Sequence, residues 1–135
     1  DSKTTTAADW EGKTDELAKT SPIEIPEDAT VKIQHKAGGY DQISYKWSDN
    51  TYKYEARWHT RTPNAPEGSP NSWVIERTTP GTPTGQQRVQ NMYTPGVNND
   101  WTPRWQWDAA VDAYNKGITT PFQDAILNAG HIDAP

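Results

Sequence analysis

Two neighbouring stretches of the chain alternate between apolar and polar residues, and this pattern limits the fold more than any other feature. The stretches are DQISYKWS (residues 41–48) and TYKYEARWHTRT (residues 51–62). Successive side chains of a β-strand point to opposite faces, so each stretch predicts a strand with one apolar face. Asp49 and Asn50 predict a turn between them. The apolar face then carries Ile43, Tyr45, Trp47, Tyr52, Tyr54, Ala56 and Trp58.

The opposite face of the second stretch carries a row of ionisable residues, namely Lys53, Glu55, Arg57, His59 and Arg61. Successive members of such a row lie about 7 Å apart. Histidine exchanges protons near neutral pH, and arginine is a permanently charged fork that suits phosphate. An acid, a base and arginines are the groups that cleave RNA without a metal. The row equally fits a solvated sheet face stabilised by ion pairs, so both interpretations stay open.

Three further stretches predict strands, namely ATVKIQHK (29–36), NSWVIERTT (71–79) and the shorter RVQNMYTP (88–95). In the 71–79 stretch we expect Trp73 and Ile75 to point into the core. Strict alternation then sends Glu76 to the ionisable face and Arg77 inward, whereas a bulge would turn Arg77 outward.

The last third of the chain carries helix signals. Thr102-Pro103 predicts the start of a helix that Gly117 ends, and Thr120-Pro121 predicts the start of a second helix that Gly130 ends. The residues expected to point inward are Trp107, Ala110, Val111, Tyr114, Phe122, Ala125, Ile126 and Ala129. The predicted fold is therefore α+β, with an antiparallel sheet of four to five strands and two C-terminal helices packed on its aromatic face.

The net charge of −5 is concentrated at the start of the chain. Residues 1–30 hold eight acidic residues and three lysines, whereas residues 31–135 hold ten residues of each sign. We therefore expect an acidic leader or linker over 1–30, in which a short helix would fall within 9–19, and one domain over 31–135. We also expect the leader to be dispensable for activity.

Several site types find no support in the sequence. The chain has no cysteine, which excludes disulfides and thiolate metal sites. It has no apolar run long enough to span a membrane. It also lacks the usual metal-binding spacings, so the sequence predicts neither a metal nor a cofactor.

Seven residues are the candidates for catalysis or phosphate binding: His59, Arg61, Glu76, Arg77, Thr79, Glu55 and His35. A threonine hydroxyl beside an arginine suits a phosphate. His35 would provide a second acid or base, although it alternates with Val31 and Ile33 and therefore points by default toward the core.

The stretches YKYEARWHTRTPNAPEGSPNSWVIERTTPG (52–81) and WTPRWQWDAAVDAYNKGITTPFQDAILNAGH (101–131) resemble the C-terminal toxin domains of bacterial polymorphic toxins of the contact-dependent, Rhs and LXG types. The resemblance covers about 31–135. It implies a nuclease that is secreted as part of a larger protein and acts in the cytoplasm of a target cell. It also implies a dedicated immunity protein. The matching residues would be His59, Arg61, Glu76, Arg77 and Thr79.

The sequence thus favours a secreted antibacterial toxin domain that is a metal-independent endoribonuclease. One alternative is a metal-dependent DNase toxin, and another is a non-catalytic, aromatic-rich binding module. Residues 31–89 carry eight basic and five acidic residues. We therefore expect the immunity protein to present an acidic surface to the face that holds His59 and Arg77.

Overall fold

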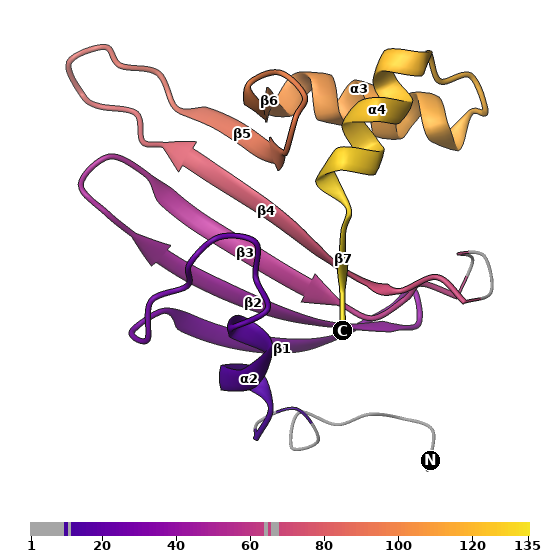
Figure 1. Ribbon diagram of the computed structural model, residues 1–135. Helices are drawn as coiled ribbons and strands as arrows, with labels where there is room; N and C mark the ends of the chain where they lie inside the picture. Colours follow the sequence, from indigo (N-terminus) through magenta and orange to yellow (C-terminus); the bar gives the residue numbers. More distant parts are fainter. Residues whose placement is uncertain (1–9, 11, 64, 66–67) are drawn as a thin grey trace. The chain divides into compact units, whose positions relative to one another are not determined.

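The computed structural model describes Trp10, residues 12–63, Ala65 and residues 68–135. In these residues the chain forms a seven-stranded antiparallel sheet in the order β1-β2-β3-β4-β5-β6, with β7 paired to β4 (Figure 1). The predicted α+β class is confirmed, but the predicted number of strands is too small. The strands are β1 (Thr30–Lys36), β2 (Tyr40–Ser48), β3 (Lys53–His59), β4 (Asn71–Thr79), β5 (Val89–Thr94), β6 (Asp100–Pro103) and β7 (Ile132–Ala134).

The described helices are α2 (Thr14–Ala18), α3 (Arg104–Asn115) and α4 (Pro121–Gly130). The start of α4 agrees with the sequence, because Thr120 and Gln123 form a reciprocal capping box. The start of α3 does not. Thr102 lies buried in β6, where its hydroxyl is 2.7 Å from that of Thr94, and Pro103 occupies the cap position without a side-chain hydrogen bond.

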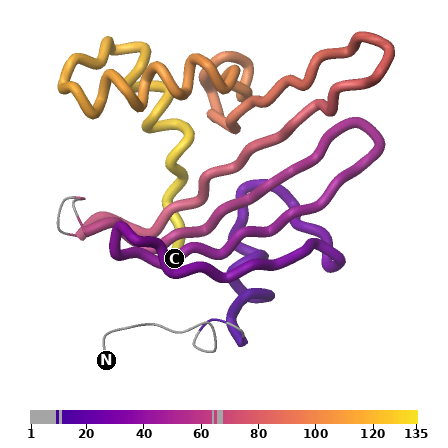
Figure 2. Tube along the Cα trace, turned by 180° about the vertical axis from the view of Figure 1, so that it is seen from behind, coloured from indigo at the N-terminus to yellow at the C-terminus, as the bar shows by residue number. Residues whose placement is uncertain are grey.

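The described residues divide into two compact units. The first contains the residues up to Trp47 together with Glu55–Trp73 and Asp133–Pro135. The second contains Ser48–Tyr54 and Val74–Ile132. Figure 2 traces the chain through both units.

The core of the first unit confirms the predicted apolar face. Its buried apolar side chains are Ile43, Tyr45, Ala56, Trp58 and Trp73. Trp47 is half-buried. The sheet alternation could therefore be predicted correctly in β2 and β3, because one face of these strands is built from large aromatic side chains.

Described residues that precede β1, namely Trp10, Thr14 and Thr20, contact side chains of this apolar face. The hydroxyl of Tyr45 donates to the carbonyl of Thr14 at 2.6 Å, and the indole N–H of Trp73 donates to the hydroxyl of Thr20 at 3.0 Å. The ring of Trp10 lies 5.0 Å from that of Trp58. These contacts join Trp10, Thr14 and Thr20 to the first unit, and the dispensability of the leader for activity stays a prediction.

The core of the second unit lies between α3, α4 and the strands. Val74, Met92, Trp107 and Ile126 form its buried cluster, and the helices pack on strands β4–β6. Val74 and its neighbour Ile75 point to opposite faces of β4. The helices therefore cover the Val74 face, and the prediction that they pack on the aromatic face is wrong.

The inward faces of the two helices are also narrower than predicted. Trp107, Ala110 and Ile126 are buried as expected. The other expected core residues Val111, Tyr114 and Phe122 are exposed. The physical reason is close packing through small residues: a Cβ atom on Gly130 would overlap the ring of Trp107.

Candidate functional site

Three members of the ionisable row, Glu55, Arg57 and His59, lie in the first unit and are half-buried, whereas Lys53 belongs to the second unit and is exposed. The side chains of Glu55 and Arg57 are 23% and 22% exposed, and their charged atoms Oε1 and Nη1 lie 3.3 Å apart. A fully solvated row would expose these long side chains far more. Glu55 and Arg57 therefore form a partly desolvated ion pair, two residues away from His59 on the same face of the strand.

Contacts with Thr60 and Tyr40 help to hold His59 at the end of this row. Its Nδ1 lies 3.0 Å from the carbonyl oxygen of Thr60, and its ring meets that of Tyr40 edge-on at 5.7 Å. A carbonyl oxygen only accepts hydrogen bonds, so Nδ1 carries the proton. In the neutral imidazole the basic nitrogen is then Nε2. The contact with Thr60 thus favours the tautomer that carries its proton on Nδ1.

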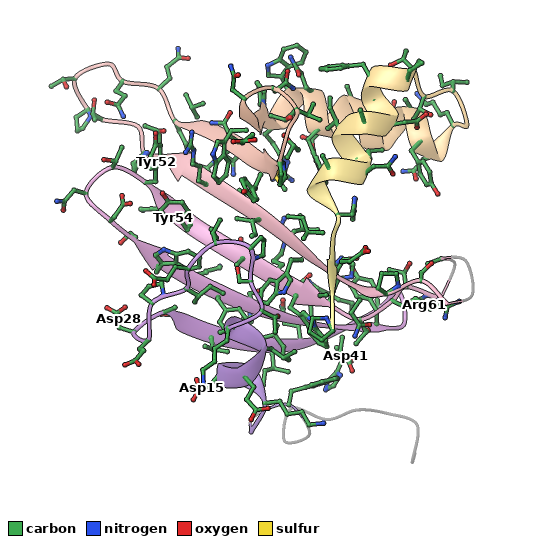
Figure 3. All side chains as sticks on the ribbon, in the orientation of Figure 1. Asp15, Asp28, Asp41, Tyr52, Tyr54 and Arg61 are labelled. Carbon is green, nitrogen blue, oxygen red and sulfur yellow. The ribbon has the colours of Figure 1, made fainter. Side chains whose placement is uncertain are left out.

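His35 is oriented by a carboxylate. Its Nδ1 lies 2.6 Å from Oδ1 of Asp41, the residue directly opposite in the β1–β2 register. The other carboxylate oxygen accepts the indole N–H of Trp10 at 3.1 Å. Figure 3 labels Asp41. The register places His35 on the same face as Ile43 and Tyr45, which is the core-facing direction expected by default, and its side chain is 38% exposed.

The two histidines do not form one two-histidine centre. Tyr40 and Asp41 are consecutive residues of β2, so their side chains point to opposite faces of the sheet. His59 contacts Tyr40, whereas His35 contacts Asp41. The structure therefore places His59 and His35 on opposite faces of the first unit.

Arg61 lies beyond the end of β3, where Figure 3 labels it. Its Nη2 donates to the carbonyl of Ala65 at 2.9 Å, and its backbone N–H donates to the side chain of Asn71 at 3.0 Å. Asn71 in turn donates to the carbonyl of Pro135. These contacts give Arg61 a structural part in the connection between β3 and β4.

Glu76 lies in the second unit, on the face that the helices cover. It is buried and forms an ion pair with Arg104, which also donates from Nε to Asp108 at 2.9 Å. The pKa of Arg104 is raised because it donates to Asp108 and because the charge of Glu76 lies close by. Glu76 thus joins β4 to α3, a structural role that alternation alone did not predict.

Arg77 points to the opposite face, between two aromatic rings. Its guanidinium carbon lies 4.3 Å from the ring centroid of Tyr52 and 4.0 Å from that of Trp101. Its Nε atom is buried and has no hydrogen-bond partner. The β4–β5 register is continuous from Glu76 to Thr79, so no bulge turns Arg77. Thr79 is half-buried on the same face.

The seven predicted residues therefore divide into separate groups. Glu55 and His59 share the β3 row, and His35 and Arg61 lie elsewhere in the first unit. Glu76, Arg77 and Thr79 belong to the second unit. The partners that orient these residues were not predicted from the sequence; they are Tyr40, Asp41, Trp10, Tyr52, Trp101 and Arg104.

Comparisons of the chain with protein-family models, with curated proteins and with solved structures found no match in any of the three. No helix in the described part of the chain is long and apolar enough to cross a membrane. Among the described residues, no three His, Cys, Asp or Glu side chains gather in a group that could hold a metal ion.

Proposed function

We propose that the chain is a metal-independent endoribonuclease of the bacterial toxin type, with its active site on the β3 row of the first unit. The main support is the orientation of His59, whose tautomer is favoured by the contact with Thr60 and whose ring contacts Tyr40. Arg57 stands between His59 and Glu55 along the strand. Two groups that transfer protons thus flank one permanent positive charge.

This order of residues matches the steps of RNA cleavage. The carboxylate of Glu55 takes the proton of a 2′-hydroxyl, and the 2′-oxygen attacks the neighbouring phosphorus. Arg57 stabilises the negative charge that develops on the phosphate. The bond from phosphorus to the 5′-oxygen breaks, and protonated His59 gives its proton to that oxygen. The products are a 2′,3′-cyclic phosphate and a 5′-hydroxyl.

Substitution of His59 tests this mechanism. We expect His59→Ala to lower the rate of RNA cleavage by roughly 10²–10⁴-fold, the usual contribution of a general acid or base. His35→Ala is the matched control, because it removes a histidine from the opposite face. RNA gels with and without a chelator, end-group analysis of the products and thermal melts of each variant provide the readouts.

The outcomes separate the alternatives. If a chelator stops cleavage, the metal-dependent DNase would be favoured. Cleavage of a DNA substrate would then be measured. Wild-type cleavage by a folded His59→Ala protein would refute the mechanism. The absence of toxicity and of cleavage by the wild-type chain would favour the non-catalytic binding module.

The proposal includes a biological setting. The chain would be secreted as part of a larger protein, act in the cytoplasm of a target cell and be neutralised by an immunity protein with an acidic contact surface. Co-expression with the product of the adjacent gene should then restore growth. A complex that leaves His59 open to solvent would contradict the predicted position of this partner.

A further inference from the structure

We propose that the second unit carries a binding surface for an unpaired RNA strand, built from five side chains that we call the stacking row. Its members are Tyr54, Tyr52, Arg77, Trp101 and Tyr93. Arg77 would bind a phosphate of the strand, and the aromatic rings would stack on its bases. The choice of RNA over other strands rests on the proposed function.

The row is continuous from one member to the next. The ring centroids of Tyr54 and Tyr52 lie 5.9 Å apart, and Arg77 follows at 4.3 Å from Tyr52. Trp101 lies 4.0 Å beyond Arg77, and the ring of Tyr93 lies 5.0 Å from that of Trp101. All five residues are half-buried, so a part of each stays accessible. Figure 3 labels Tyr52 and Tyr54.

The row brings together residues from four parts of the sequence. Tyr52 precedes β3 and Tyr54 lies within it, whereas Arg77 comes from β4. Tyr93 and Trp101 face each other directly in the β5–β6 register. Their side chains stand on the face opposite to the buried Met92, which packs against the helices. The helices therefore do not cover the stacking row.

Arg77 differs from the other arginines of the chain whose ion pairs are described. Arg57 pairs with a glutamate, and Arg104 pairs with a glutamate and an aspartate. In the part of the chain that the structure describes, no carboxylate forms a salt bridge with Arg77 and its buried Nε has no acceptor. The guanidinium lies over the rings of Tyr52 and Trp101, and these ring faces do not provide a hydrogen-bond acceptor for the Nε–H donor.

The two rings also prepare Arg77 for binding. They hold the planar guanidinium between them, so little side-chain freedom remains to be lost when an anion binds. A guanidinium fork suits the two oxygens of a phosphate. Proteins that bind single strands combine such positive charges with aromatic platforms, because every base offers a face for stacking. An acidic protein partner would use the charge but would have no need of the rings.

The test measures binding apart from cleavage. In the full chain carrying His59→Ala, a fluorescein-labelled 12-nucleotide unpaired RNA is titrated by fluorescence anisotropy. We expect Arg77→Gln and Trp101→Leu each to weaken binding by about tenfold, as loss of one good contact usually does. Arg88→Gln is the matched control, since it removes the same charge from an exposed position of the same unit. It should change the affinity by less than about twofold.

Two further variants keep the test valid if Trp101→Leu fails to fold. Trp101→Phe keeps a ring and should retain most of the affinity. Arg77→Lys keeps the charge without the planar fork and should lose most of it. The same RNA paired with its complement should bind more weakly than the unpaired strand.

Several results would overturn the stacking row. One is an equal loss of RNA affinity in Arg77→Gln and Arg88→Gln. Another is an equal affinity for unpaired and paired RNA. A third is an affinity for polyglutamate equal to that for unpaired RNA, which would indicate an acidic protein as the ligand. If the wild-type chain cleaves RNA while the row variants bind and cut normally, the row fails and the nuclease stands. If the row variants lose RNA binding but the wild-type chain does not cleave RNA, the nuclease fails and the row stands.

Discussion

Tyr45 should cause the free energy of unfolding to fall as the pH rises in the alkaline range. Its phenol is buried and donates a hydrogen bond to the carbonyl of Thr14. Burial of the hydroxyl and, secondarily, the charge of Asp15 raise the pKa of Tyr45 above its ordinary value. A group whose pKa is raised by folding contributes stability below its unfolded pKa and loses that contribution as the pH rises above it.

The size of the effect follows from the hydrogen bond and from proton linkage. At pH 7, Tyr45→Phe should lower the free energy of unfolding by about 1 kcal/mol, the usual net value of one hydrogen bond. An unfolded tyrosine ionises near pH 10, whereas folded Tyr45 stays protonated at pH 11. The wild-type protein should therefore lose about 1.4 kcal/mol between pH 9 and pH 11 that the phenylalanine variant does not lose.

Urea unfolding followed by far-ultraviolet circular dichroism at pH 7, 9 and 11 measures this difference. We expect the wild-type protein to be the more stable one at pH 7 and to lose that advantage at pH 11. Tyr114→Phe is the matched control, because Tyr114 is exposed and its loss should leave the pH dependence unchanged. A stability difference between wild type and Tyr45→Phe that is the same at pH 7 and pH 11 would refute the reasoning.

Three further variants test the packing and the site. Gly130→Ala should lower the free energy of unfolding by about 1–3 kcal/mol, because the added methyl group would overlap an indole ring of α3; an unchanged urea midpoint would contradict this close contact. Thr20→Val should lower the free energy of unfolding by about 1–3 kcal/mol, because the indole N–H of Trp73 loses its acceptor, whereas Thr20→Ser should change it little. Equal urea midpoints for the two variants would show that Thr20 does not contact the sheet. His35→Ala should cleave RNA within about twofold of the wild-type rate, in contrast to His59→Ala, and an equal loss in both would indicate that both faces take part.

The face of β2 and β3 could be predicted because aromatic residues occupy one side of these strands. The same reasoning failed in β4, where Val74 and Ile75 are both buried. A strand covered on both faces has no alternation that shows which side the helices occupy. The strands β6 and β7 have four and three residues, too few to show a period.

The candidate site was predictable only where the contacts are local. His35 and Asp41 flank the turn between β1 and β2, so their pairing could have been inferred from a symmetric hairpin register. The contact between His59 and Tyr40 joins residues that are distant in the sequence, and no sequence pattern predicts it. The hydrogen bond between Tyr45 and the carbonyl of Thr14 could not be predicted either, because every residue has a backbone carbonyl and the acidic composition of residues 1–30 is typical of a linker.

The pair of indole rings formed by Trp10 and Trp58 gives the first unit a spectroscopic marker. The two rings lie 5.0 Å apart with an angle of 63° between their planes. Chromophores that are this close and not parallel couple their electronic transitions. In the circular dichroism spectrum this coupling splits the tryptophan band into two components of opposite sign. This exciton couplet should disappear when the segment before β1 leaves the sheet. Undocking of the segment could then be followed optically in the unlabelled protein, separately from the unfolding of the strands.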